Sequence, residues 1–221
     1  MARPAKFTLA EIRREALALV DRDGLAGLTM RGLAAALKTG PMTLYNYVDS
    51  KESLEELVVD AVASEVPPVV VTSDWAADLT IAATGLWATV RLHPAVIPLV
   101  LTRRTSNSAS LRPAEDIASA LARSGRTGFD LLVAFRAVMG FVMGIAQAEL
   151  AGPLTRHIDP RQEATDLASV AGEANPTLAQ LSRLAGEDAR REFDEGLRVL
   201  VLGLTRERAP EGGSPESRTQ G

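Results

Sequence analysis

The chain has 221 residues, of which 46% are apolar and 24% are charged, as is typical of a folded globular protein. It contains no cysteine, which excludes disulfides, thiolate zinc sites and cysteine nucleophiles. The two histidines, His93 and His157, lie 64 positions apart, so we expect neither a metal site nor a cofactor. No run of about 18 consecutive apolar residues occurs, and we expect a cytoplasmic protein without a membrane partner.

The charge is distributed unevenly along the chain. The net charge of the whole chain is -4. Residues 1–51 hold eight basic and five acidic side chains, whereas the remaining residues hold 16 basic and 23 acidic ones. A basic N-terminal segment on an acidic body permits a nucleic-acid partner despite the negative total.

Local signals predict three helices in the first 50 residues. Apolar spacings of three and four begin after Thr8, and Thr8 with Glu11 fits a capping box. Gly24 is expected to end this first helix, because glycine adopts left-handed backbone conformations without strain. A second helix is predicted from Thr29, and Pro41 suits the first position of a third helix after a tight turn.

The remainder of the chain is predicted to be helical as well. Asp49 or Ser50 can cap a fourth helix, which ends before the prolines of residues 66–68. The β-branched stretch 69–72 has no second strand to pair with, so we interpret it as a buried linker. Further helices are predicted at 75–93, 95–103, 113–124, 130–150 and 187–204.

These elements predict an all-α protein in three parts. A helix-turn-helix head occupies residues 1–50, a larger helical domain occupies residues 51–207, and a disordered tail occupies residues 208–221. Gly, Pro and polar residues interrupt the stretch 151–176, which predicts a long mobile loop within the larger domain.

Two short helices joined by a tight turn describe a helix-turn-helix, whose second helix fits the major groove of DNA. Leu44 and Val48 share the inner face of this second helix, so the other residues of 41–48 face outward. Asn46 can form paired hydrogen bonds with adenine, and Lys51 can bind a phosphate. The residues expected to contact DNA are Met30, Arg31, Pro41, Met42, Thr43, Tyr45, Asn46, Tyr47 and Lys51.

The same segment has a plainer interpretation. Tyr45 and Tyr47 can be half-buried packing residues, and the charged side chains can be ordinary solvated surface. A helical protein-interaction module without DNA binding therefore stays open as an alternative. An enzyme has little support, because the acids near His157 lack a nucleophile, base and oxyanion site at a recognisable spacing.

Residues 8–57 resemble the DNA-binding region of the TetR family of transcriptional repressors. Lys38 departs from the pattern, since it stands where the family commonly has the turn glycine, and Gly40 replaces a serine-type cap. A glycine cap costs about a few tenths of a kcal/mol relative to serine, so the expected fold is unaffected. The matching segments are LTMRGLA at 28–34, MTLYNYV at 42–48 and KESL at 51–54.

This resemblance implies a homodimeric repressor that binds a palindromic operator and is released by a small-molecule effector. It assigns ligand binding and dimerisation to residues 51–207, with helices near 127–150 and 187–205 pairing with their symmetry mates. The larger domain looks most like the tetracycline-repressor subgroup. By this resemblance, Val100 and Arg103 stand at the positions of the histidine and threonine that help to hold magnesium-bound drug there, so we do not expect this protein to sense magnesium-tetracycline.

An apolar cavity with a few polar groups is the expected effector site. Ordinary core packing is the alternative for the apolar residues, and His93 can instead be a cap or a hydrogen-bonded packing residue. The expected lining residues are Trp87, Phe135, Met139, Val142 and Met143, with Arg91, His93, Arg103 and Gln147 as the polar groups.

Overall fold

A computed structural model of the chain describes residues 7–102, 107–150, 175–184 and 188–206. Within these ranges the secondary structure is helical, without a β-strand, which confirms the all-α prediction. The predicted tail and nearly all of the predicted loop at 151–176 lie outside the described residues.

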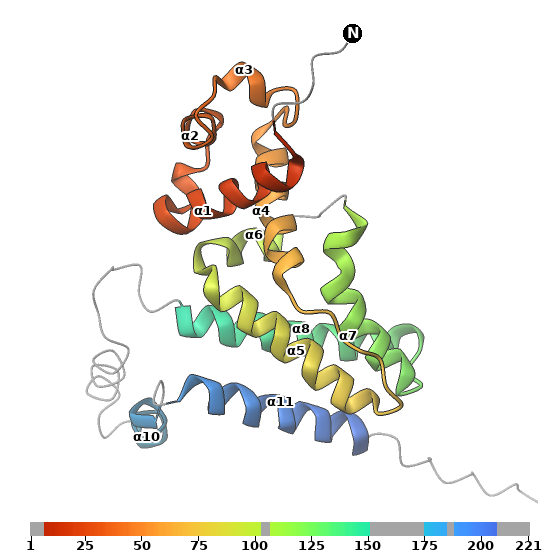
Figure 1. Ribbon diagram of the computed structural model, residues 1–221. Coiled ribbons are helices and arrows are strands. Elements are labelled where there is room, and N and C mark those ends of the chain that lie inside the picture. The colour runs from red at the N-terminus through yellow and green to blue at the C-terminus, as the bar shows by residue number, and fades with distance from the viewer. Residues whose placement is uncertain (1–6, 103–106, 151–174, 185–187, 207–221) are drawn as a thin grey trace, which may run out of the picture.

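The head consists of α1 (Leu9–Gly27), α2 (Met30–Ala36) and α3 (Pro41–Leu44), at the top of Figure 1. The capping box is present: the Glu11 N–H donates to Thr8 Oγ1 at 3.2 Å and the Thr8 N–H donates to Glu11 Oε2 at 2.7 Å. These bonds satisfy backbone groups that the first turn leaves without partners, and so fix the start of α1. The Thr8 N–H, together with the Thr8 hydroxyl, lowers the pKa of the Glu11 carboxyl by donating to it.

Gly24 divides α1 into two helical segments. Its backbone is non-helical, with φ 70° and ψ -179°, and a short helical segment follows it as far as Gly27. The first segment therefore ends at Gly24 as predicted, although the short segment continues α1 beyond the kink. Glycine tolerates this conformation, so the chain bends there and Leu28 still becomes buried at 1% exposure.

Helix α4 (Lys51–Glu65) runs from the head into the body (Figure 1). Ser50 caps it, since its hydroxyl accepts from the Ser53 N–H at 3.1 Å. The linker that follows was predicted to be buried but lies on the surface: Val70 is 82% exposed and Val71 is 64% exposed. It crosses the surface until Thr72 binds the body.

The body contains three long helices that contact one another: α5 (Trp75–Leu92), α8 (Gly128–Leu150) and α11 (Ala189–Arg206). They lie below the head in Figure 1. The segment predicted as one helix at 95–103 is instead a 3-10 turn followed by a short helix. The shorter elements are η1 (Pro94–Val96), α6 (Ile97–Thr102), η2 (Ser108–Leu111), α7 (Arg112–Arg123) and α10 (Pro176–Leu184).

Helix α8 is unusually apolar. Its segment Gly128–Ala148 has a mean hydropathy of 1.9, so among the described helices it is long and apolar enough to cross a membrane. In the body it packs on α5, α7 and α11. One side of α8 therefore belongs to the core, and its other side leaves apolar residues such as Phe129 exposed.

Candidate functional site

The turn between α2 and α3 gives the head its helix-turn-helix geometry. The Leu37 N–H bonds to the Leu33 carbonyl at 3.0 Å, and the Thr39 N–H bonds to the Ala34 carbonyl at 2.9 Å. Lys38 has φ 50°, the left-handed conformation that favours glycine. Lysine thus adopts the backbone shape for which the family pattern commonly supplies glycine, and the turn is kept.

Helix α3 places its apolar residues inward as predicted. Leu44 is fully buried and Val48 is 2% exposed. The helix itself ends at Leu44, and the predicted range 41–48 is too long, because residues 45–47 form a turn. In that turn the N–H groups of Tyr47 and Val48 share the Leu44 carbonyl at 2.8 and 2.9 Å.

Several of the predicted DNA contacts form one exposed face around α3. Met42 is 78% exposed and Tyr45 is 50% exposed, while Pro41 and Asn46 are exposed and Thr43 is half-buried. Met42 is exposed although the opposite side of the same helix is fully buried. The outer side of α3 therefore presents both polar and apolar atoms to base edges.

Tyr47 differs from its expected outward orientation. It is half-buried, its ring packs against the head core, and its hydroxyl accepts from the Phe7 N–H at 3.1 Å. The hydroxyl proton can still be donated to another acceptor. No local sequence pattern indicates this bond, because Phe7 precedes the first helix and lies 40 positions from Tyr47.

The other predicted contacts surround this face. Met30 is half-buried against the core, whereas Arg31 is exposed. The side chain of Lys51 is 67% exposed, with its Nζ 3.9 Å from Glu55 Oε1. Nearby, the Ser53 hydroxyl lowers the pKa of the Asp49 carboxyl by donating to it at 2.8 Å.

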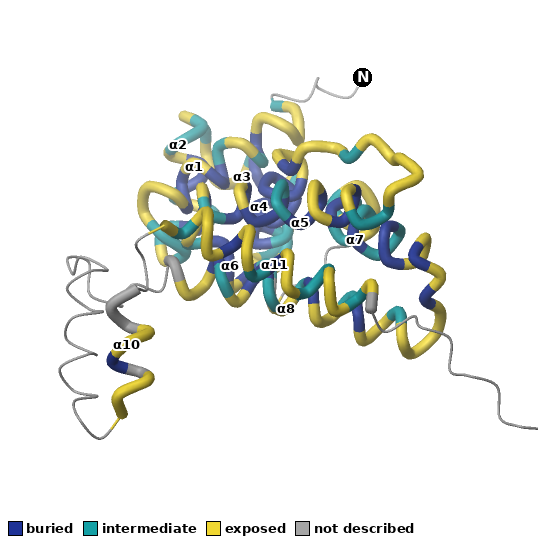
Figure 2. Tube along the Cα trace, turned by 90° about the horizontal axis from the view of Figure 1, so that it is seen from below, coloured by how far each residue is buried: buried dark blue, intermediate teal, exposed yellow. Residues whose placement is uncertain are grey.

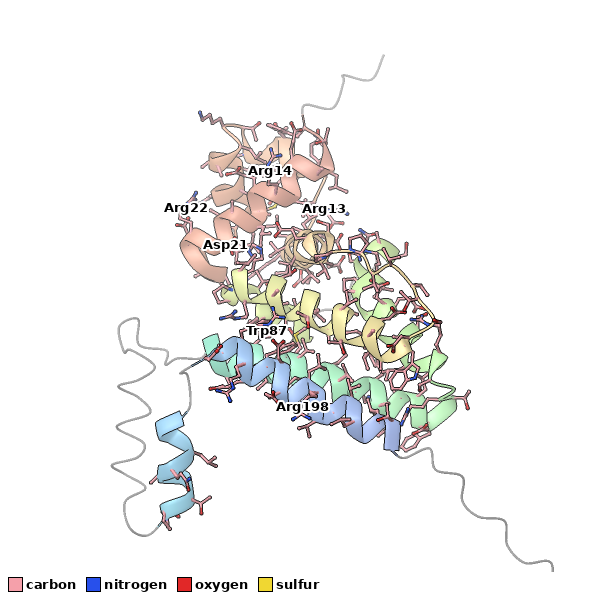
Figure 3. All side chains as sticks on the ribbon, turned by 60° about the horizontal axis from the view of Figure 1, so that its bottom comes forward. Arg13, Arg14, Asp21, Arg22, Trp87 and Arg198 are labelled. Carbon is pink, nitrogen blue, oxygen red and sulfur yellow. The ribbon has the colours of Figure 1, made fainter. Side chains whose placement is uncertain are left out.

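The expected ligand residues fall into two groups. Trp87 is 1% exposed and stacks on Phe193 with ring centroids 4.3 Å apart and planes inclined by 12°. The guanidinium carbons of Arg91 and Arg190 lie 4.4 and 5.7 Å from the Trp87 ring centroid. Figure 3 shows Trp87 at the boundary between α5 and the helices beneath it. Trp87 and Arg91 are thus brought together.

The second group lies along α8. Val142 and Met143 are buried, Phe135 and Met139 are partly buried against the core, and Gln147 is exposed. A groove of about 410 Å³ lies beside this core, between α5 and α11. It is lined by Thr80, Thr84, Arg190, Asp194, Leu197, Arg198, Val201 and Leu202.

The glycine Gly196 sets the approach of α11 to α8. A Cβ atom added there would meet Phe141 Cε2 and Cζ at 2.6 Å. The Phe141 ring in turn contacts the Phe193 ring, with centroids 5.5 Å apart. The Trp87 stack is therefore supported from behind by an aromatic ring that a larger residue would displace.

His93 does not join the Trp87 cluster through its ring nitrogens. Nδ1 lies 2.9 Å from Asp21 Oδ2 and Nε2 lies 2.9 Å from Glu65 Oε2. The ring contacts agree with the hydrogen-bonded alternative for His93, while its place in a ligand cavity stays a prediction. The remaining predicted ligand residue, Arg103, lies outside the described residues.

The fold and the exposed face of α3 define a helix-turn-helix protein with a helical body. Residues 68–208 match the family model described as "Tetracyclin repressor-like, C-terminal domain". A curated HTH-type transcriptional regulator of Saccharopolyspora erythraea is 34% identical over 202 residues, covering 90% of this chain and 84% of that protein. The chain belongs to the TetR family of transcriptional regulators.

Other relatives agree with this assignment. The HTH-type transcriptional repressor DrrR1 of Streptomyces coeruleorubidus is 32% identical, over 65% of this chain and 54% of that protein. The TetR family protein ActR of Streptomyces coelicolor, in complex with (S)-DNPA, is 26% identical with a TM-score of 0.73, covering 91% of this chain and 98% of that one. The family comprises transcriptional regulators rather than enzymes, so the enzymatic alternative is dismissed.

Proposed function

We propose that this protein is a homodimeric repressor, which binds a palindromic operator with its two heads and leaves DNA when a small molecule binds to the body. The exposed face of α3 over the fully buried Leu44 carries the proposal. A helix anchored in this way can enter the major groove as a rigid unit, because its apolar side is fixed by packing.

The residues around α3 divide into two roles. Asn46 and Met42 can read base edges, through paired amide hydrogen bonds and through contact with a thymine methyl group. Arg31, Tyr45 and Lys51 can bind phosphates, which position the head without reading sequence. One head offers few phosphate contacts, and two heads on one palindrome add their electrostatic attraction.

The exposed side of α8 supports a two-fold dimer. Phe129 is 79% exposed and Val133 is 49% exposed, and a Cβ added to Gly140 or Gly144 would meet nothing within 4 Å. On the neighbouring helix α11, Val199 is 62% exposed. Figure 2 shows exposed stretches on both helices from below. Exposed apolar and small residues at spacings of four and seven along α8 suit a symmetric helix-to-helix interface.

The body supports a small-molecule effector. The TetR family protein ActR of Streptomyces coelicolor has been crystallised in complex with actinorhodin, and that structure has a TM-score of 0.74 to this chain at 25% identity. In this protein the Trp87 stack, its two arginines and the adjoining groove provide apolar area with a few polar groups. A ligand that favours one placement of the heads would release DNA by linkage.

Selection of bound duplexes from a random pool tests the proposal. We expect a palindrome whose half-sites are about 34–36 Å apart. Asn46→Ala should reduce affinity for the selected duplex by roughly 10-fold or more, because a bidentate base contact is worth about 1–3 kcal/mol. Ala122→Arg, on the exposed face of α7, is the control and should bind like the wild type. Recovery of random duplexes would favour the interaction-module alternative.

A further inference from the structure

The ring of His93 joins three helices at the boundary between head and body. The residue is 8% exposed, and its two nitrogens bind Asp21 on α1 and Glu65 on α4. One ring therefore connects α1 and α4 to the end of α5.

Backbone structure fixes the position of this ring. His93 is the C-cap of α5, with its N–H bonded to the Val90 carbonyl at 3.1 Å. Pro94 follows directly and begins η1, which packs on α1. The proline and the cap keep the end of α5 against the head, so a shift of α5 is a shift of the His93 ring.

A separate polar contact holds α1 at another point. Arg13 Nη2 binds Asp60 Oδ2 of α4 at 2.9 Å, and Asp60 also accepts from Asn107 at 3.1 Å and from Ser110. Arg13 and Asp21 are eight positions apart on α1, which is about 12 Å along a helix. Two polar attachments separated by this distance hold α1 at two points, in addition to its apolar packing along α4. Loss of the attachment at Asp21 therefore leaves the end of α1 near His93 less firmly held than the end near Asp60.

The same helix that ends in His93 carries the candidate effector residues. Trp87 and Arg91 precede His93 by six and two positions on α5. Figure 3 shows Asp21 at the body-facing end of α1, above α5. A ligand that displaces the Trp87 stack therefore acts on the helix whose end holds the head.

We propose that His93 is a positioning residue, which sets the orientation of the head by binding Asp21 and Glu65 and passes movements of α5 to α1. The link to effector release rests on the proposed function, whereas the control of head orientation does not. Breaking the His93 contacts should leave the head folded and packed on α4, with Asp60 still bound, but should loosen the end of α1 that faces the body and so widen the range of head orientations.

Distances between two spin labels test the orientation directly. The chain has no cysteine, so Ala35→Cys on α2 and Ala122→Cys on α7 provide the labelling sites, both exposed. The labelled chain is diluted with excess unlabelled protein, so that an assembly contains at most one labelled copy. We expect a narrow head-to-body distance distribution in the wild type and a broader one in His93→Ala and Asp21→Asn.

A matched control lies two residues from Asp21. Asp23 pairs with Arg22 on the same helix at 2.9 Å, so Asp23→Asn makes the same change of charge without touching His93. It should leave the distribution narrow. Asp21→Asn keeps the shape of the side chain, and circular dichroism verifies that each variant is folded. An unchanged distribution in both His93→Ala and Asp21→Asn would overturn the proposal.

DNA binding separates this inference from the proposed function. Once a palindrome has been selected, His93→Ala should bind a single half-site as tightly as the wild type and bind the palindrome on the order of tenfold more weakly, because less firmly oriented heads lower the effective concentration of the second contact. Equal losses on both duplexes would indicate a general defect and would refute positioning. If the wild type binds no duplex, the proposed function fails while the label distances still test His93.

Discussion

The head and the body bury their apolar residues in different ways. In the head, Ile12, Leu33 and Leu44 are fully buried by residues of the same chain. In the body, α8 and α11 bury one side and leave Phe129 and Val199 largely exposed. The head therefore buries its apolar core within a single copy, whereas the proposed dimer would cover the apolar residues that the body leaves exposed.

The largest expected effect comes from charging the exposed side of α8. Gly140→Arg would place a long cation where our proposal has a partner helix, and should convert the dimer to a monomer. Operator affinity should then fall by about 100-fold or more, because the second head no longer binds from the same assembly. Sedimentation velocity gives the mass, and Ala122→Arg on exposed α7 should remain dimeric. A dimeric Gly140→Arg protein would place the interface elsewhere.

Removing a core side chain from the head should lower the free energy of unfolding by the same amount at any protein concentration. Leu44→Ala is expected to lower the free energy of unfolding of the head by about 2–5 kcal/mol, since it removes a fully buried leucine. Denaturant unfolding at two protein concentrations measures this loss. Met42→Ala, on the exposed side of α3, should change stability by less than about 0.5 kcal/mol. A concentration-dependent loss in Leu44→Ala would show that the head core is not self-contained.

A smaller effect with a defined pH dependence is expected at Asp78 in the body. The backbone N–H of Thr72 lowers the pKa of this carboxyl, as do the Thr72 hydroxyl and Arg123. A lowered folded pKa stabilises the protein above the ordinary value of about 4 and ceases to do so as pH falls through the folded value. Asp78→Asn should therefore be less stable than the wild type at pH 7.

Thermal melts from pH 7 to pH 2 measure this difference. The two curves of melting temperature against pH should converge below about pH 4, where the wild-type carboxyl gains its proton. Asp23→Asn, which removes an exposed carboxyl from the head, provides the comparison. A gap that persists at the lowest pH would mean that the aspartate acts through shape rather than charge.

The smallest effect is expected at the turn of the head. Lys38 has φ 50°, a conformation that costs a residue with a Cβ atom about 1–2 kcal/mol. Lys38→Gly should raise the melting temperature slightly, because the relief of strain exceeds the added freedom of the unfolded chain, roughly 0.4–1 kcal/mol. Gly24, with φ 70°, allows the opposite test, and Gly24→Ala should lower the melting temperature. A less stable Lys38→Gly protein would show that the lysine side chain stabilises the turn.

The sequence predicted the head better than the contacts between head and body. Thr8, Ser50 and Pro41 act on their own or the next helical turn, so a single sequence reveals them. The partners of His93 are 72 and 28 positions away, and no local pattern indicates which side chains a folded chain brings together. Helix α10 was also not predicted, because it follows a polar stretch that glycines and prolines interrupt and that therefore indicates a loop.

The linker shows another limit of local patterns. Its valines suggested burial, yet Val70 and Val71 are largely exposed. Their position is decided by the body that the linker crosses, where Thr72 binds Asp78. The apolar composition of a segment indicates that burial would stabilise it. Whether it is buried depends on whether the surrounding helices offer a surface that covers it.

Gly196 sets the separation of α11 and α8 by its lack of a side chain, and not by an attractive contact. Because its side chain is a hydrogen atom, α11 and α8 can close around one phenylalanine ring, and the Phe141 edge lies where a methyl group would otherwise stand. Any larger residue there must displace that ring, which contacts Phe193, the ring stacked on Trp87. The room available beside the tryptophan thus depends on a glycine one helical turn from its stacking partner, so a substitution at Gly196 would alter which molecules fit there.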